Sequence, residues 1–251
     1  MRRSPLSSGG GSSLAPTLLY SVDLTAQGTQ ASIAAGPFTV AGKTWTFWDV
    51  GGFATPALSL TPTDGLKLVA DVGGSSFGGV VLPLSQIGTG LLDVLWRRRV
   101  VVSARAEITT PNTGPTTVGA VLAQGGTTQA GWSNWAQQCV RQKADGWAPV
   151  AMRNGVELPV AVNRVTADPA DDVIALTLFD SQSFAVATGA WSSGYPAPSA
   201  MHEHGAMSAA NFGQPSTAIP AVSAVGVGAM VYQDAAAATV LKLKHLKVEV
   251  Y

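Results

Sequence analysis

The chain has 251 residues, of which 46% are hydrophobic and only 12% are charged, and its formal net charge at pH 7 is zero. A neutral chain without a basic tract offers no electrostatic basis for binding nucleic acid or an anionic membrane, so we expect neither as a partner. Its single cysteine, Cys139, excludes an intrachain disulfide and a cysteine-based zinc site, which suits assembly in a reducing cytosol.

Residues 1–17 are rich in Ser and Gly and carry two arginines, Arg2 and Arg3. Such a segment buries too little apolar surface to offset its ordering entropy, and it lacks the apolar core of a secretory signal. We therefore predict a flexible N-terminal arm. It is either a disordered tail or an assembly arm that becomes ordered on a neighbouring subunit, where its arginines would pair with acidic residues.

From residue 18 onward the chain reads as short strands joined by turns. Period-two alternation and turn residues predict strands over residues 18–24, 32–40, 44–50, 58–60, 65–70, 77–84, 99–109 and 118–124. Pro83 marks the strand that contains it as an edge strand or as one that ends there. Residues 91–96 predict one short helix.

The next part of the chain contains the clearest hairpins. Strands are predicted over residues 135–142 and 146–153, and Asn154-Gly155 is a strong turn signal because a type I′ turn needs positive φ at both central residues. Residues 171–191 predict two strands that fold back at residues 180–183.

Residues 192–220 have no clear period, so this stretch is either functional or hides an element that the pattern misses. Two strands close the chain, over residues 222–232 and 239–251. In the last one the hydrophobic parity shifts at Lys244 and His245. Keeping both halves buried requires a β-bulge there, with Leu246 facing the core and Lys247 facing solvent.

The order of these signals resembles the concanavalin A-like, laminin-G-like jelly roll. The matching features are the first strand LLYSVDL, the pair VVVSARAEIT and VGAVLAQ, the ladder QQCVRQ and WAPVAMRNGVEL, the hairpin DDVIALTLFDSQSFAVATGAW, and the terminal pair VGVGAMVYQ and TVLKLKHLKVEVY. The resemblance covers nearly all of the chain after the arm. It implies an all-β fold, a single antiparallel sandwich over residues 18–251 whose first and last strands pair. It leaves function open, because lectins, glycosidases and adhesion modules share this fold.

Enzymatic activity is not expected. A retaining glycosidase needs two carboxylates about 5 to 5.5 Å apart, and the members of this fold that cleave glycans carry a Glu-x-Asp-x-x-Glu strand. The chain has no such run: Glu107 has no acidic residue two positions away, and Asp171 and Asp172 are adjacent, so they point to opposite faces of an extended strand.

The one cluster of histidines and carboxylates is His202-Glu203-His204. Histidines two apart on an extended segment point the same way and suit a shared metal, with Asp171 as a further candidate ligand. A polar loop segment is the competing interpretation. Asp168, Asp171 and Asp172 offer the oxygen atoms that Ca²⁺ prefers, but without the calcium-site spacing of the lectins, so we predict no cofactor.

Five aromatic residues are the best candidates for a glycan platform: Trp132, Trp135, Trp147, Trp191 and Tyr195. Sugar rings stack on exposed aromatic rings, whereas burial in the core is the commoner use of tryptophan. Coplanar and exposed rings would favour glycan binding, and buried rings would favour a purely structural role.

With its Ser/Gly-rich arm, low charge and single cysteine, the chain resembles accessory structural proteins of tailed bacteriophage virions. That resemblance implies a non-enzymatic capsid decoration, head-fibre or tail-associated subunit, assembled in the host cytoplasm and carried on the virion. Its expected partners are further copies of itself, most plausibly as a trimer, and other virion proteins. The alternative is a lectin-like module that recognises bacterial or extracellular polysaccharide, and both roles can coexist on one particle.

Overall fold

In the computed structural model, the described residues are 15–49, 53–70, 76–88, 99–109, 116–124, 137–143, 146–153, 156–157, 171–178, 184–207, 225–233 and 239–251. The described strands form two sheets, and all described strand pairs are antiparallel. The predicted antiparallel β-sandwich is thereby confirmed. Within the described ranges, no helix is long and apolar enough to cross a membrane.

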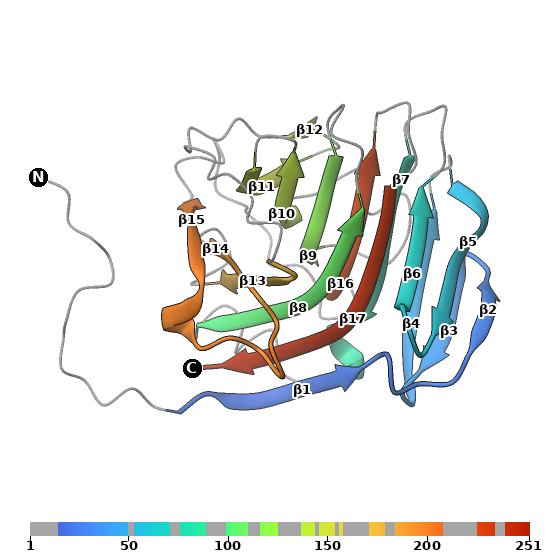
Figure 1. Ribbon diagram of the computed structural model, residues 1–251, viewed down its shortest axis with the longest axis horizontal. Helices are drawn as coiled ribbons and strands as arrows, with labels where there is room; N and C mark the ends of the chain where they lie inside the picture. Colours follow the sequence, from blue (N-terminus) through green and yellow to red (C-terminus); the bar gives the residue numbers. More distant parts are fainter. Residues whose placement is uncertain are drawn as a thin grey trace, which may run out of the picture.

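The sheet that we call sheet A contains both ends of the described chain. Its strands follow the order β15 (His202–Met207), β14 (Phe184–Gly189), β13 (Val173–Leu178), β8 (Val100–Thr109), β17 (Thr239–Val250), β6 (Gly65–Ala70), β5 (Phe53–Thr61) and β2 (Gln30–Ile33). The first strand, β1 (Thr17–Asp23), pairs with the last, β17, as the jelly-roll resemblance implies. Figure 1 shows β1 running alongside β17.

Sheet B packs behind sheet A (Figure 1). Its strands follow the order β12 (Val156–Glu157), β11 (Gly146–Arg153), β10 (Gln137–Lys143), β9 (Thr116–Gln124), β16 (Val225–Gln233), β7 (Ser76–Pro83), β4 (Lys43–Asp49) and β3 (Gly36–Val40). Two short 3₁₀ turns, η1 (Leu84–Gln86) and η2 (Pro198–Ala200), complete the described elements.

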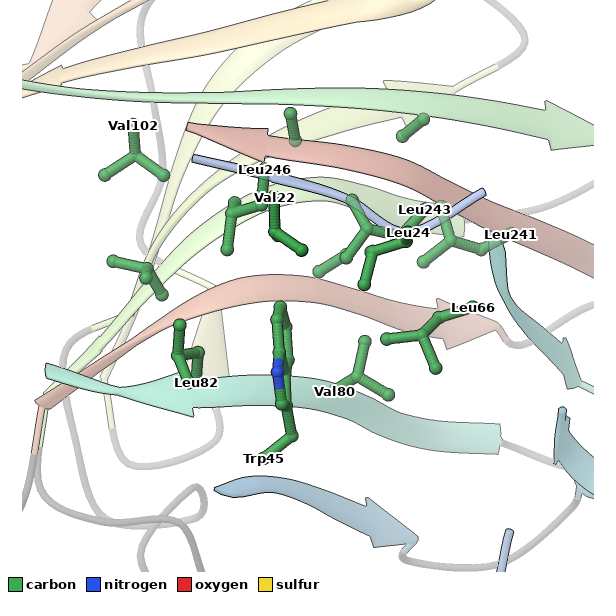
Figure 2. Packing of buried hydrophobic residues seen from close by; sticks show 14 of the residues in the cluster. Val22, Leu24, Trp45, Leu66, Val80, Leu82, Val102, Leu241, Leu243 and Leu246 are labelled. Carbon is green, nitrogen blue, oxygen red and sulfur yellow. The ribbon is translucent and has the colours of Figure 1, made fainter. Parts of the chain in front are cut away.

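One hydrophobic cluster fills the space between the sheets. Sheet A contributes alternate residues of its strands, and on β17 these include Leu241, Leu243 and Leu246, each fully buried. Figure 2 shows the Trp45 side chain extending from sheet B into this layer. Burying one leucine side chain is worth roughly 1.5 to 3 kcal/mol, so the cluster supplies most of the driving force for holding the sheets together.

The predicted β-bulge in β17 is present. Leu243 pairs with Ala106 of β8, and the next pair is His245 with Arg105, so Lys244 is the extra residue. Leu243 and Leu246 are both fully buried although they are three positions apart along the strand, an odd spacing that strict alternation would place on opposite faces. The bulge therefore keeps the core side of β17 continuous and turns two consecutive residues, Lys244 and His245, to the outer face of sheet A.

Two parts of the chain differ from the sequence-based expectation. Residues 32–40 were expected to form one strand, but the chain leaves sheet A after β2 and enters sheet B at β3. Gly36, with φ of 116°, begins the new strand in a conformation that residues with a side chain rarely adopt. Residues 192–220 contain a strand that periodicity did not reveal, β15, which pairs with β14.

The structure also tests the predictions made for Pro83 and for the turn at Asn154-Gly155. Pro83 ends β7, which lies between β16 and β4, so the proline marks a strand end and not a sheet edge. The pairing of Arg153 with Val156 closes the hairpin predicted at Asn154-Gly155. The predicted helix over residues 91–96 lies outside the described residues, as do Arg2 and Arg3. The predicted division of the chain into an N-terminal arm, residues 1–17, and a sandwich domain, residues 18–251, stays a prediction.

Candidate functional site

The outer face of sheet A is crossed by the segment between β14 and β15, residues 190–201, which we call the strap. It is drawn in orange in Figure 1, where it passes in front of β8 and β17. Its two ends lie close together: a Cβ atom at Gly189 would approach the Met201 sulfur to 2.8 Å and the Pro196 ring to 3.0 Å. Because the Met201 and Pro196 side chains fill the space beside Gly189, the end of the strap packs closely against the residue that precedes it.

Trp191, at the beginning of the strap, is the centre of an aromatic and cationic cluster. Its ring stacks on the His245 ring, with centroids 4.4 Å apart and planes 27° apart. The Arg105 guanidinium carbon lies 4.9 Å from the indole centroid, and the Tyr195 ring meets the indole edge-on at 4.9 Å. Trp191 remains half-buried, so these contacts fix the ring while part of it faces solvent.

Asp172 holds this cluster to the sheet. Its Oδ2 accepts a hydrogen bond from Arg105 Nε at 2.8 Å, and its Oδ1 accepts one from the Trp191 backbone N–H at 2.7 Å. Its own carbonyl oxygen accepts the Ala106 backbone N–H at 2.7 Å. One carboxylate therefore orients both the indole and the guanidinium that lies against it. Charge-assisted hydrogen bonds of this kind are among the stronger ones in proteins.

Tyr195 ties the middle of the strap to β8. Its hydroxyl donates to the Ser103 carbonyl oxygen at 3.3 Å, and Lys247 Nζ lies 4.4 Å from its ring centroid. Burial raises the pKa of the Tyr195 phenol well above its usual value, and the nearby Glu249 carboxylate raises it further. The phenol therefore stays protonated and serves as a hydrogen-bond donor.

His245 is the second ring of the cluster, and it reaches the outer face through the bulge. Burial lowers the pKa of His245, and the Asp23 carboxylate, 3.6 Å from Nε2, opposes this shift without overcoming it. The imidazole is therefore mostly neutral at pH 7, and it offers Trp191 a flat ring and little charge.

The rest of the outer face carries paired charges. Lys242 lies 2.9 Å from Asp64, which also lies 3.7 Å from Lys67. Glu107 contacts Lys244 directly and lies 4.0 Å from Lys242. Such alternation of opposite charges on neighbouring strands gives a polar surface with little net potential.

A second, smaller cluster lies where the strap joins β15. The Asp171 side chain is only 2% exposed, and its Oδ2 accepts a hydrogen bond from the Thr188 hydroxyl at 2.5 Å. The same oxygen lies 3.0 Å from Nδ1 of His202, whose side chain is 56% exposed. Adjacent aspartates thus fix the two ends of the strap, Asp172 through Trp191 and Asp171 through His202.

The predicted aromatic residues do not all meet. Trp191 and Tyr195 lie in contact on sheet A. Trp147 pairs with Gln142 in sheet B, and only its backbone is described. Trp132 and Trp135 lie outside the described residues. Two of the five candidates therefore share one surface.

The predicted metal ligands are only partly brought together. His202 contacts Asp171, but His204 is the extra residue of an irregular pairing, because Val186 pairs with Gly205 and Ala187 with Glu203. That irregularity interrupts the alternation on which a shared histidine site was based. In the part of the chain that the structure describes, no group of three or more His, Cys, Asp or Glu residues could hold a metal ion. Asp168 lies outside the described residues.

Two residues of the cluster, Arg105 and His245, were not among the site residues considered from the sequence, and Asp172 was considered only as an oxygen ligand for Ca²⁺. Arg105 lies in the strand predicted over residues 99–109, where alternation alone gives it no role. The parity shift that predicts the bulge also indicates that His245 faces outward. No local signal places residue 191 against residue 245, because that contact depends on the path of the strap.

No protein-family model matches the sequence, and no curated protein matches it. Three similar solved structures are the lumenal domain of VIP36 in its Ca²⁺/Man3GlcNAc-bound form, peanut lectin with a bound peptide, and a carbohydrate esterase of the Shiga toxin-encoding bacteriophage phi24B. The VIP36 domain is 10% identical, covering 82% of this chain and 83% of that one with a TM-score of 0.49. Peanut lectin is 10% identical, covering 92% and 98% with a TM-score of 0.44. The esterase is 12% identical, covering 94% and 99% with a TM-score of 0.41.

Proposed function

We propose that this chain is a non-enzymatic carbohydrate-binding β-sandwich and that the outer face of sheet A around Trp191 is its binding surface. The observation that carries this proposal is the fixed, half-buried indole of Trp191. Asp172 anchors its backbone, and His245, Arg105 and Tyr195 contact its ring. A ring that is already immobilised loses little further conformational entropy when the apolar face of a sugar packs against it.

The surroundings of Trp191 supply the polar half of a sugar site. Sugar hydroxyls donate and accept hydrogen bonds, so they need both kinds of partner close to the aromatic ring. The Arg105–Asp172 pair lies beside the ring, and the pair of Lys247 and Glu249, 2.9 Å apart, lies next to Tyr195. Each pair presents cationic donors and carboxylate acceptors in a fixed arrangement.

The carboxylates of this face support binding over hydrolysis. A general acid works best with a raised pKa, and a nucleophile needs access to the sugar carbon. Glu107 contacts Lys244, and Asp172 is held by Arg105 and by the Trp191 amide. Both carboxylates are therefore already engaged in ion pairs and hydrogen bonds within this face, an arrangement that suits a binding surface.

We also propose that the chain acts as a virion subunit that attaches a bacteriophage to host-surface polysaccharide. One structural feature favours an assembly role. Leu18 at the start of β1 is 57% exposed, the one large hydrophobic residue so exposed among those described, and it stands where the N-terminal arm joins the sandwich. An exposed apolar residue at the start of the first strand is a suitable contact for a neighbouring subunit.

The carbohydrate proposal is tested by measuring binding of the purified chain to bacterial and plant polysaccharides. Replacing Trp191 by alanine should weaken binding about 30-fold, because truncating a central aromatic anchor costs on the order of 2 kcal/mol. Tyr251→Ala is the matched control: its ring also lies against a guanidinium, that of Arg99 at 5.2 Å, but it has no ring contact with Trp191. If no polysaccharide binds, or both variants lose affinity equally, the proposal is wrong.

A further inference from the structure

We infer that the Trp191 surface selects uncharged saccharides over acidic ones, such as those that carry uronic acid, sialic acid or sulfate groups. This inference rests on the proposed function and adds the chemical class of its ligand. It is based on the carboxylate partners that the lysine and arginine side chains on the outer face of sheet A already have.

Each described cationic side chain near Trp191 already has a carboxylate partner. Arg105 Nε lies 2.8 Å from Asp172 Oδ2 and Lys247 Nζ lies 2.9 Å from Glu249 Oε2, with side-chain exposures between 16% and 23% in these two pairs. Further along the face, Lys244 contacts Glu107, and Lys242 lies 2.9 Å from Asp64. No described lysine or arginine around the ring is therefore left to neutralise an incoming anion.

His245 does not fill that role. It lies against the indole, and its imidazole is in contact with the ring and near Asp23, whose Oδ1 lies 3.6 Å from Nε2. Burial favours its uncharged form near neutral pH. The histidine thus adds aromatic surface to the site while adding little positive charge.

An acidic sugar would have to compete for cations that are already paired. Recruiting Arg105 would leave the Asp172 carboxylate without its partner and next to the new negative charge, and like charges at close range repel. A hydroxyl, in contrast, accepts from a guanidinium or ammonium and donates to a carboxylate without separating the pair. The paired surface therefore favours ligands that have many hydroxyl groups and no charge.

One cation of this face, Arg99, has no carboxylate partner among the described residues. Arg99 stands six residues before Arg105 in the chain, which corresponds to roughly 20 Å along an extended strand, and its guanidinium lies over the Tyr251 ring. That distance places Arg99 outside a site of one or two sugar units centred on Trp191. It provides an internal reference, because an anion attracted to Arg99 alone would not need Trp191.

The experiment uses the full chain on an array that prints each neutral saccharide beside its uronic acid and its sulfated counterpart. We expect the neutral members to bind roughly tenfold more strongly than their acidic counterparts. Their binding should change by less than about twofold between about 0.05 M and about 0.5 M salt, since screening acts on charged ligands. Trp191→Ala should remove this binding. Glu249→Gln, which frees Lys247, should gain salt-sensitive binding of the acidic members.

The outcomes separate this inference from the proposed function. Acidic members that bind as tightly as the neutral ones, with binding lost in Trp191→Ala, would overturn the inference and leave the binding surface intact. Failure of Glu249→Gln to gain acidic binding, in a variant that melts like the wild type, would also count against it. Acidic binding that survives Trp191→Ala but is lost in Arg99→Gln would overturn the assignment to Trp191. An array without any binding would overturn the proposed function itself.

Discussion

His245 stacks on Trp191 because one extra residue in β17 turns the imidazole to the outer face of sheet A. The two rings lie 4.4 Å apart, and the bulge at Lys244 separates His245 from the buried Leu243. Without this extra residue, strict alternation would point either residue 243 or residue 246 away from the core. The same irregularity therefore preserves the core and builds the candidate site.

The turn before β6 depends on glycine where it contacts this bulge. Gly65 has φ of 65°, and a Cβ atom there would collide with the Leu243 carbonyl oxygen. We expect Gly65→Ala to lower the free energy of unfolding by about 2 to 4 kcal/mol, combining backbone strain with the displaced strand. Urea denaturation measures this effect.

Gly42→Ala is the matched control, because Gly42 has a similar φ of 69° but nothing within 4 Å of the added Cβ. Gly42→Ala should lower the free energy of unfolding through backbone strain alone, by about 1 kcal/mol. Equal losses in the two variants would show that the turn does not press on the bulge.

The inward half of β17 beyond the bulge should carry much of the stability. Leu246 is fully buried in the shared cluster and pairs with Val22 of β1. Leu246→Ala should cost roughly 2 to 5 kcal/mol, through lost burial and the cavity left behind. Thr44→Ala, at an exposed position of β4, should change stability by less than about 0.5 kcal/mol. A small effect at Leu246 would contradict the register of β17 on both sides of the bulge.

Local pattern predicts the framework of this sandwich better than its surface. The bulge was visible because Leu243 and Leu246 are both apolar in a strand whose alternation is otherwise strict. The strand β15 was not, because its sequence HEHGAM has no alternating apolar face and no β-branched residue. The chain crossing at Gly36 was also missed, since nothing in the alternation on either side distinguishes one sheet from the other.

The candidate site was harder to predict for a different reason. Trp191 and Tyr195 were chosen as aromatic residues able to contact a sugar, but their neighbours come from strands far away in the sequence. Asp172 and Arg105 meet because β13 pairs with β8, and their role follows only when the strap is seen to cross that pair. The spacing of residues along the sequence therefore cannot predict such a contact.

Asp172 should control the order of the strap. Asp172→Ala removes the acceptor of the Trp191 N–H and the partner of Arg105, whereas Asp172→Asn keeps an acceptor oxygen but loses the charge. We expect amide hydrogen exchange at Trp191 to accelerate strongly in the alanine variant and only slightly in the asparagine variant. If neither variant changes that exchange rate, the strap is held by its aromatic contacts alone.

Stability should decrease on acidification through His245. Burial lowers the pKa of His245 below its usual value of 6.5, so the unfolded chain binds this proton more readily than the folded one. The resulting stabilisation is complete above the unfolded pKa and declines as pH falls from about 6.5 through the folded pKa. His245→Phe keeps an aromatic ring against Trp191 but cannot titrate. Denaturation curves at several pH values should show a shallower pH dependence in this variant, and parallel curves would rule out His245 as the source.

Assembly is expected to depend on the start of β1. Leu18 is exposed on the first strand, next to the arm, and a chain with no net charge has little electrostatic repulsion to keep copies apart. We expect light scattering to give three times the chain mass of 25.6 kDa. Deleting residues 1–15 or replacing Leu18 by Glu should reduce this to the mass of one chain, because both changes remove apolar or arm contacts at the same place. Thr44→Glu, at an exposed position of β4 in the other sheet, should leave the assembly unchanged. A mass near one chain for the intact protein at every concentration would show that the arm and Leu18 make no contact between copies.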